Sequence, residues 1–418
     1  MKLPGISDRL LFAAALAVAA LMLIRFAVQK AAEPRKITLV FAYAEIPPMN
    51  EDDEELLHSL AGEFEALNPG IGIKFEKKSY GELKNLVREI PGAETENAKN
   101  RKTVPDIAAL DDWLLRDGIR KDSLVSLYAD KEKTQGETSP EISRAVPLVS
   151  LVDVLFYNID ILKAAGLDKP PGNYGEFLAA AEAAAKYAMT GGAGTDGIHA
   201  AALALSPDDP RSVFRDVFSW MWAAGSGPLG PETGGDFPGR RAAAALEFLG
   251  RLARDGRLAP GTFEKTGTER LEEFAKGKIG MMIGSVKDIA FLEKNMKGAF
   301  SITRVPGPAE YAGRPVFALY GLYAGILRQC AHVDEARAFL AFLAEKNPGQ
   351  TAWMEAADPL SVKARDMYEA AEIIQGYAGF IWGAELEDTV RKELVPLLEG
   401  NRNGADTAAA IASQWKIK

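Results

Sequence analysis

The sequence predicts an α/β fold built as two compact units, and three observations lead to this prediction. First, a chain of 418 residues with 47% apolar and 26% charged side chains can bury a core large enough for two domains. Second, strand and helix patterns alternate near the start of the chain, as they do where right-handed crossovers join parallel strands. Third, buried strand patterns return after a helix-rich middle, so the chain crosses between the units more than once.

The first unit begins with residues 36–110. Apolar spacing predicts, in order, strand 36–44, helix 51–67, strand 71–77, helix 80–90 and strand 105–110. The first helix is the clearest, because Leu57, Leu60 and Phe64 keep helical spacing behind an acidic first turn, and Asn-Pro-Gly (68–70) ends it. This order of elements predicts parallel strands.

The middle and the end of the chain read as helices separated by a few buried strands. Helical patterns occupy 173–188, 211–224, 240–255, 269–277 and 333–350, and strand patterns occupy 278–284, 300–308 and 316–327. The segment "YNIDILKAAGLDKPPGNYGEF" (157–177) is marked at each boundary: a short helix stops at Gly166, and Asn173 with Glu176 predicts a capping box. Because this segment has no His, Cys, Ser or Thr, it is not a site of nucleophilic chemistry.

The N-terminal segment "LLFAAALAVAALMLIRFAV" (10–28) is apolar apart from Arg25, which is typical of a secretion signal or a membrane anchor. A signal peptidase needs small residues near 27–32, where Gln29 and Lys30 stand, and no cysteine follows for lipid attachment. We therefore expect an uncleaved anchor, with a cleaved signal as the alternative. Basic residues just beyond the segment run against the tendency of positive charge to stay in the cytoplasm.

The remainder of the chain is acidic. Without residues 1–36 it holds 43 basic and 56 acidic residues, a net charge of −13. Such a charge repels nucleic acid and anionic lipid, so we expect no nucleic-acid partner and a neutral or cationic ligand.

Catalytic and metal-binding motifs are lacking. The three histidines have no metal-ligand spacing, no Walker A or GxSxG sequence occurs, and "GSGPLG" (225–230) follows a helix and contains a proline, unlike a dinucleotide fingerprint. Cys330 is the single cysteine and is predicted to be a buried, inert thiol. We expect no metal, no cofactor and no catalysis. The pair Asp111 and Asp112 could form a glycosidase dyad, but adjacent residues seldom reach the required separation.

Aromatic residues beside carboxylates are the positive signal. Aromatic rings near predicted loop ends are Tyr43, Trp113, Tyr157, Trp220, Trp222, Tyr320, Tyr323, Trp353 and Trp382, and acids accompany several of them. Sugars offer C–H faces for rings and hydroxyl groups for carboxylates, so a cleft lined by both would suit a carbohydrate. Each ring taken alone is better explained as core. Trp220 and Trp222 lie two apart on a helix, so at most one of them lines a cleft.

Several segments resemble the family 1 extracellular solute-binding proteins of ABC importers, the maltose-binding-protein-like group. The most specific is "VPLVSLVDVLFYNIDILKAAGLDKPPGNYGEFLAAAEAAAK" (146–186), with its YN–helix–G–L–PP–helix pattern. The others follow in family order: "ITLVFAYAE", "LAGEFEALNPGIGIKFE", "PDIAALDDW", "FAKGKIGMMIGS" and "VDEARAFLAFL".

The resemblance implies a two-lobed periplasmic binding protein-like fold with a multi-strand hinge, preceded by an N-terminal hydrophobic helix. The expected division is 1–36 for the signal or anchor, 37–150 plus 320–355 for lobe I, and 151–319 plus 356–418 for lobe II. The expected ligand-binding residues are Tyr43, Glu45, Asp111, Asp112, Trp113, Asp153, Trp222, Ser285, Lys287, Tyr320 and Trp382. Two departures stand out: no aromatic residue occurs in "GSVKD" (284–288), and the lipid-anchor cysteine is missing.

These observations predict a non-catalytic receptor that binds a neutral solute, an oligosaccharide or related sugar, and delivers it to an ABC permease. It would lie in the periplasm or outside the cytoplasmic membrane, tethered by residues 10–28. Two alternatives remain open: a membrane-anchored sensory or scaffolding protein with a degenerate cleft, and an extracytoplasmic glycosidase.

Overall fold

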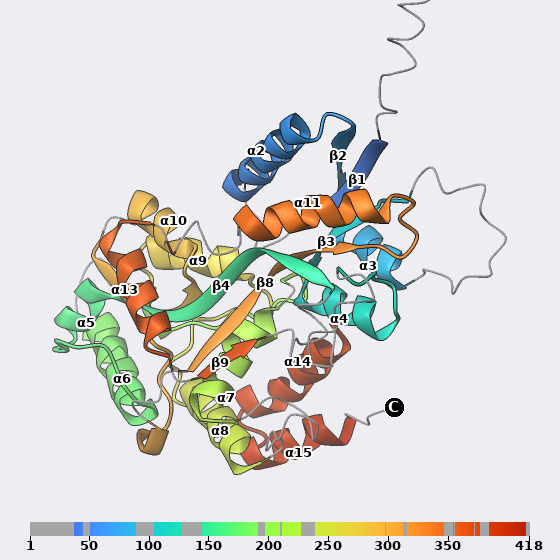
Figure 1. Ribbon diagram of the computed structural model, residues 1–418. Helices are drawn as coiled ribbons and strands as arrows, with labels where there is room; N and C mark the ends of the chain where they lie inside the picture. Colours follow the sequence, from blue (N-terminus) through green and yellow to red (C-terminus); the bar gives the residue numbers. More distant parts are fainter. Residues whose placement is uncertain are drawn as a thin grey trace, which may run out of the picture.

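The computed structural model describes most of the chain beyond the apolar N-terminal segment (Figure 1). The described residues are 37–44, 51–88, 104–127, 144–190, 197–209, 211–226, 239–296, 298–311, 316–346, 354, 356–371, 373–376 and 384–414. The predicted anchor, residues 10–28, therefore lies outside them. Within the described part of the chain, no helix has the length and apolar character needed to cross a membrane.

The first half of the sheet follows the predicted alternation. Strand β1 (Ile37–Ala44) pairs in parallel with both β2 (Ile71–Lys78) and β3 (Ile107–Asp111). The crossovers contain α2 (Glu51–Leu67) and α3 (Tyr80–Arg88). Parallel pairing, predicted from the order of elements, is confirmed.

Two long strands join this half to the second. Strand β8 (Val316–Ile326) runs antiparallel to β3, and β4 (Ala145–Asn158) pairs with β8 through residues 145–152. From residue 153 onward, β4 pairs instead with β6 (Ile279–Ser285) and β7 (Phe300–Thr303). Figure 1 shows β4 and β8 running side by side through the middle of the molecule.

The full strand order is β2-β1-β3-β8-β4-β6-β5, and two strands lie off this path. Strand β5 (His199–Ala201) pairs in parallel with β6, β7 pairs with β4, and β9 (Ile373–Gly376) pairs in parallel with β8. Gly321 pairs with Ser150, just beyond the register shift of β4 between Pro147 and Val149, and a Cβ there would come within 2.1 Å of the Val149 carbonyl oxygen. The close approach of the two long strands therefore requires glycine.

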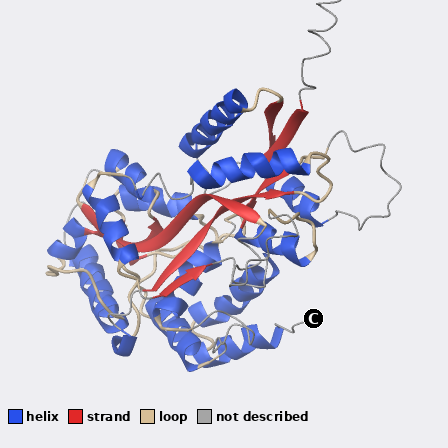
Figure 2. Ribbon diagram, viewed as in Figure 1, coloured by secondary structure: helices blue, strands red, loops and turns tan. Residues whose placement is uncertain are grey.

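Helices surround the strands (Figure 2). The remaining ones are α4 (Asp112–Arg120), α5 (Ile159–Ala164), α6 (Tyr174–Thr190), α7 (Ser219–Ala223), α8 (Arg240–Arg254), α9 (Gly267–Ala275), α10 (Asp288–Asn295), α11 (Val333–Lys346), α13 (Pro359–Glu369), α14 (Ala384–Leu398) and α15 (Gly404–Gln414). The helices α8, α14 and α15 pack against one another at one end (Figure 1). The predicted α/β class is confirmed, and the exact lobe boundaries stay a prediction.

The segment 157–177 has the caps that its sequence predicts. Asn158 caps α5, since its side chain accepts the Ile161 N–H at 3.0 Å. Asn173 accepts the Glu176 N–H at 3.0 Å, and Glu176 reaches back to the Gly172 N–H at 2.8 Å. These contacts fix the exit of the chain from β4 into two helices.

The predicted helix 211–224 is less regular than its spacing suggests. The chain is π-helical over η2 (Phe214–Phe218) and becomes α-helical only in α7. Within this turn Asp216 accepts the Ala204 N–H at 3.0 Å, a contact with a distant segment that spacing along one helix does not encode. Such π turns are frequent at functional sites.

Cys330 is buried, as predicted. Burial raises the pKa of its thiol to about 12, so the reactive thiolate is scarce at neutral pH.

Candidate ligand-binding site

A cavity of about 320 Å³ lies where β4 passes from β8 to β6. The register of the strands places four lining residues next to one another, because Leu151 pairs with Tyr320 and Asp153 pairs with Ser285. Its lining residues are Leu151, Asp153, Asp209, Arg211, Arg215, Gly267, Thr268, Leu271, Met282, Ile283, Gly284, Ser285, Lys287, Asp288, Phe291 and Tyr320. Four predicted ligand-binding residues, Asp153, Ser285, Lys287 and Tyr320, thus face one cavity.

The turn from β6 into α10 forms one wall. Asp288 accepts the Ser285 N–H at 2.8 Å, and the Lys287 N–H donates to the Ser285 hydroxyl at 3.2 Å. Burial raises the pKa of Asp288 to about 6. The turn therefore holds the Ser285 and Lys287 side chains at the cavity in a fixed backbone geometry.

An ion pair joins this wall to the first half of the protein. The Lys287 ammonium contacts the Asp53 carboxylate in the first turn of α2, and both side chains are more than four-fifths buried. The two residues are 234 positions apart in the chain. Lys287 is therefore both a cavity residue and a link between the two halves.

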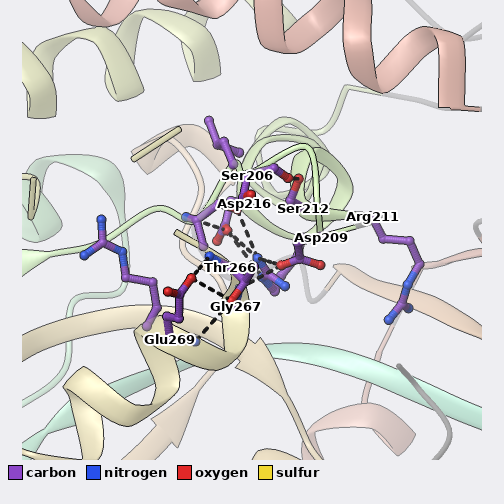
Figure 3. A network of polar contacts seen from close by, with 12 residues as sticks. Ser206, Asp209, Arg211, Ser212, Asp216, Thr266, Gly267 and Glu269 are labelled. Carbon is purple, nitrogen blue, oxygen red and sulfur yellow. Dashed lines mark hydrogen bonds and ion pairs between the residues drawn. The ribbon is translucent and has the colours of Figure 1, made fainter. Parts of the chain in front are cut away.

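A buried charge network forms the wall behind α9 (Figure 3). The Arg215 guanidinium contacts Asp209 at 3.0 Å and Asp216 at 2.9 Å. Asp209 also accepts the Gly267 N–H at 2.7 Å, and a Cβ on Gly267 would come within 2.4 Å of the guanidinium. The absence of a side chain at Gly267 thus lets α9 begin directly on Arg215.

Arg211 comes from the same loop but points elsewhere. Figure 3 shows its side chain extending away from the network of Asp209, Ser212 and Asp216. Its Cζ atom lies 4.2 Å from the centre of the Tyr320 ring, within cation–π range. Burial raises the pKa of the Tyr320 hydroxyl, so the phenol stays protonated and can act as a hydrogen-bond donor.

Asp111 and Asp112 form hydrogen bonds with buried groups beside β8 and do not line the cavity. Asp111 caps α4 by accepting the Leu114 N–H at 2.9 Å, and it accepts the Tyr80 hydroxyl at 2.9 Å. Asp112 accepts the Gly321 N–H at 3.0 Å and the Tyr323 hydroxyl at 3.2 Å. Both carboxyls are 1% exposed, so neither presents itself to a substrate as a glycosidase dyad requires.

Replacing Asp112 by asparagine is expected to flatten the pH dependence of stability. Burial raises the pKa of Asp112 to about 7, well above that of an unfolded aspartate. Its contribution to stability is complete below the unfolded pKa of about 4 and is lost as the pH rises through about 7. Asparagine keeps the shape and does not ionise.

Urea unfolding at about pH 5 and about pH 8 measures this effect. Between these values the wild type should lose about 2–4 kcal/mol more than the Asp112→Asn variant. Parallel pH profiles for the two proteins would show that Asp112 titrates as an ordinary carboxyl.

The other predicted residues lie apart from the cavity or outside the described residues. Tyr43 is 5% exposed, packs on Phe75 and donates its hydroxyl to Glu54. Trp222 is buried against Phe218, with ring centres 6.1 Å apart. Glu45, Trp382 and the side chain of Trp113 lie outside the described residues. Ligand contacts by these residues, and by Asp111 and Asp112, stay predictions.

The sequence did not predict most of the lining residues, and two of these, Phe291 and Arg211, add a ring and a charge to the cavity. Phe291 on α10 is 37% exposed and lines the cavity, whereas Ile289 and Leu292 on the same helix are buried. It supplies an aromatic ring near the segment 284–288, which has none. The sequence did contain one indication that Phe291 lies outside the core, because this aromatic residue is not on the apolar face of its helix. Nothing in the sequence pattern predicted that Arg211 lines the cavity, because its position depends on the conformation of a loop.

No group of three or more His, Cys, Asp or Glu side chains with metal-binding geometry occurs among the described residues. The cavity instead combines one exposed phenylalanine ring, one tyrosine ring, a serine hydroxyl and several charged side chains. Such a mixture is suited to an oxygen-rich solute, which can form hydrogen bonds and ring contacts with it.

The model of the bacterial extracellular solute-binding protein family matches residues 50–348, which is most of the chain. The chain belongs to this family. A binding protein of Brucella abortus (strain 2308) is 24% identical over 315 residues, covering 68% of this chain and 67% of the relative.

Solved structures of bacterial solute-binding proteins have a fold similar to that of this chain. The cyclic alpha-maltosyl-1,6-maltose binding protein of Arthrobacter globiformis aligns with a TM-score of 0.69 and 17% identity, covering 90% of this chain and 97% of that one. A solute-binding protein of Thermotoga lettingae bound with alpha-D-tagatose gives a TM-score of 0.65 and 16% identity, covering 90% and 98%. The predicted two-lobed periplasmic binding protein-like fold and the predicted family are confirmed.

Proposed function

We propose that this protein is the receptor of an ABC importer and that it carries a sugar or sugar-like solute in the cavity beside β4, β6 and β8. The observation that carries the proposal is the meeting of Asp153, Ser285, Lys287 and Tyr320 with the exposed ring of Phe291 in one cavity. These groups match the hydroxyls and the C–H faces of a sugar. The carbohydrates named for the two similar structures support the same class of ligand.

The partner and the location follow from the same proposal. As such a receptor the protein would pass its ligand to the membrane subunits of an ABC permease on the outer side of the cytoplasmic membrane, which is in keeping with an extracellular solute-binding family. The apolar segment 10–28 would tether the receptor to that membrane. N-terminal sequencing of the membrane-associated protein tests the tether, since a cleaved signal would leave a start near residue 32.

Replacing Phe291 by alanine is expected to weaken sugar binding by about fivefold, or ~1 kcal/mol, because the ring contact with the sugar is lost. Calorimetry against a panel of neutral and acidic mono- and disaccharides identifies the ligand and measures the loss. Met189 is 74% exposed and remote from the cavity, so Met189→Ala is the matched apolar truncation and should bind normally. Full affinity in Phe291→Ala would remove this ring from the site, and no binding to any sugar would overturn the proposed ligand class.

One observation supports a second candidate function. The segment 10–28 lacks a good cleavage site, and a permanently anchored protein of this fold could serve as a sensor or scaffold. The two functions differ in their consequence: deletion of the gene abolishes uptake of the bound sugar only if the protein is a transport receptor.

A further inference from the structure

The ion pair of Asp53 and Lys287 connects elements on opposite sides of the two long strands. Asp53 lies in the first turn of α2, which packs on β2 and α11. Lys287 directly precedes α10, which packs on β6 and α9 (Figure 1). In the strand order β2-β1-β3-β8-β4-β6-β5, β2 and β6 lie on opposite sides of the β8–β4 pair. The ion pair therefore bridges the two halves that β4 and β8 join.

Both members of this ion pair are largely removed from water. The Lys287 side chain is 17% exposed and the Asp53 side chain is 11% exposed. Taking two charges out of water is costly, and removing one partner leaves the other charge buried without compensation. The best-attested role of such a pair is to select one arrangement of a protein over its alternatives. The arrangement selected here has α2 and the turn from β6 into α10 side by side.

The lysine end of the pair belongs to the wall of the cavity. Lys287 and Ser285 both line the cavity, and the Lys287 N–H donates to the Ser285 hydroxyl at 3.2 Å. Asp288 accepts the Ser285 N–H at 2.8 Å. These contacts lie within one turn, so they persist if α2 moves away. The contact with Asp53 does not persist, and its loss changes the cavity wall directly.

The aspartate end differs from the other acids of α2. Glu54 accepts the Tyr43 hydroxyl of β1, and Glu63 pairs with Lys346 of α11 at 2.7 Å. Both of these contacts stay within the first half of the protein, and the Glu63 and Lys346 side chains are about half exposed. Asp53 is buried and reaches the second half, although it is not among the described residues that line the cavity. Any effect of Asp53 on a ligand thus passes through Lys287 or through the arrangement of the halves.

We propose that Asp53 is a positioning residue for the ligand site, because its ion pair with Lys287 holds the two halves closed around the cavity. The inference rests on the proposed function and adds the contact that couples closure to binding. A ligand that binds only the closed arrangement has an apparent affinity reduced in proportion to the fraction of protein that is closed. Loss of the pair lowers this fraction. By the same linkage, a bound solute favours the ion pair.

Small-angle X-ray scattering of the purified protein without added sugar tests the closure, whatever the ligand is. Asp53→Asn keeps the shape of the side chain, removes its charge and should give a larger radius of gyration than the wild type. Glu63→Gln is the matched control, since it makes the same charge change on the same helix at a contact within one half, and it should scatter as the wild type does. Equal radii for the wild type and Asp53→Asn would overturn this inference and leave the proposed function standing.

A double-mutant cycle tests whether the two residues act through each other. Lys287→Gln alone should also enlarge the radius of gyration, and the double variant Asp53→Asn, Lys287→Gln should be no more open than either single variant. Circular dichroism establishes that each variant is folded. Additive opening by the two substitutions would show that they act through separate contacts, which would refute the ion pair as the device that holds the halves.

Calorimetry connects closure to binding once the panel has identified the sugar. Asp53→Asn should bind this sugar about tenfold more weakly, as expected if the closed fraction falls to about one tenth, and Glu63→Gln should bind normally. Weaker binding with unchanged scattering, or a larger radius with unchanged affinity, would contradict the coupling. If the wild type binds no sugar of the panel, the proposed ligand class fails, while the scattering data still decide whether the ion pair holds the halves closed.

Discussion

Replacement of Arg215 by alanine is expected to lower the free energy of unfolding by about 3–5 kcal/mol. Arg215 is 18% exposed, and its partners Asp209 and Asp216 are 11% and 3% exposed. Without the guanidinium, two carboxylates stay in a poorly hydrated site with no matching positive charge. Breaking one member of a buried ion pair is costly for this reason.

Chemical denaturation of the two proteins measures this loss. The matched control is Arg251→Ala, because Arg251 pairs with Asp255 at 3.5 Å on the helix surface, where the side chains are 60% and 44% exposed. That change should alter stability by less than about 0.5 kcal/mol. If the two alanine variants lose the same small amount, the Arg215 network is hydrated and does not stabilise the cavity wall.

Replacement of Trp222 by alanine is the second large expected effect, a loss of about 3–5 kcal/mol. Its ring is 2% exposed and packs with Phe214 and Phe218, whose ring centres lie 6.3 and 6.1 Å away. Truncation would leave a cavity that these rings cannot close without moving the π-helical turn. The substitution removes apolar burial and dispersion contacts together.

Trp222→Phe is the control, since it keeps an aromatic ring and should cost less than half as much. Thermal unfolding ranks the three proteins, and calorimetry on each measures sugar affinity. A Trp222→Ala protein with wild-type stability and lost affinity would restore Trp222 to the ligand site and refute its role in packing.

Local sequence patterns were sufficient to predict many of the helices and strands. The helix α2 and the strands β1 and β2 lie where apolar spacing and the Asn-Pro-Gly stop at 68–70 predict them. These signals are short-range: amphipathic spacing, helix caps and turn residues act within a few positions of one another. The predicted parallel pairing also holds, because connection handedness restricts how such units can close.

The site was only partly predictable. Asp153, Ser285 and Lys287 were predicted from the family resemblance and Tyr320 from the aromatic residues near loop ends, and the structure places all four at one cavity. Trp222 lies in the core instead, because an aromatic residue in a helix gives no local sign of whether its outer face meets solvent or other rings. Asp112 likewise bonds to β8, 209 residues away along the chain from Gly321, and no spacing rule reaches that far.

The sequence by itself determined the α/β class, the order of strands and helices over residues 36–110, the capped segment 157–177 and the absence of catalytic and metal-binding motifs. The tertiary structure alone decided where charges are matched: Arg215 with two aspartates, Lys287 with Asp53, and Arg211 over Tyr320. The physical reason is that helices and strands arise from interactions between near neighbours, whereas the chemistry of a cavity depends on which distant side chains burial brings within a few ångströms.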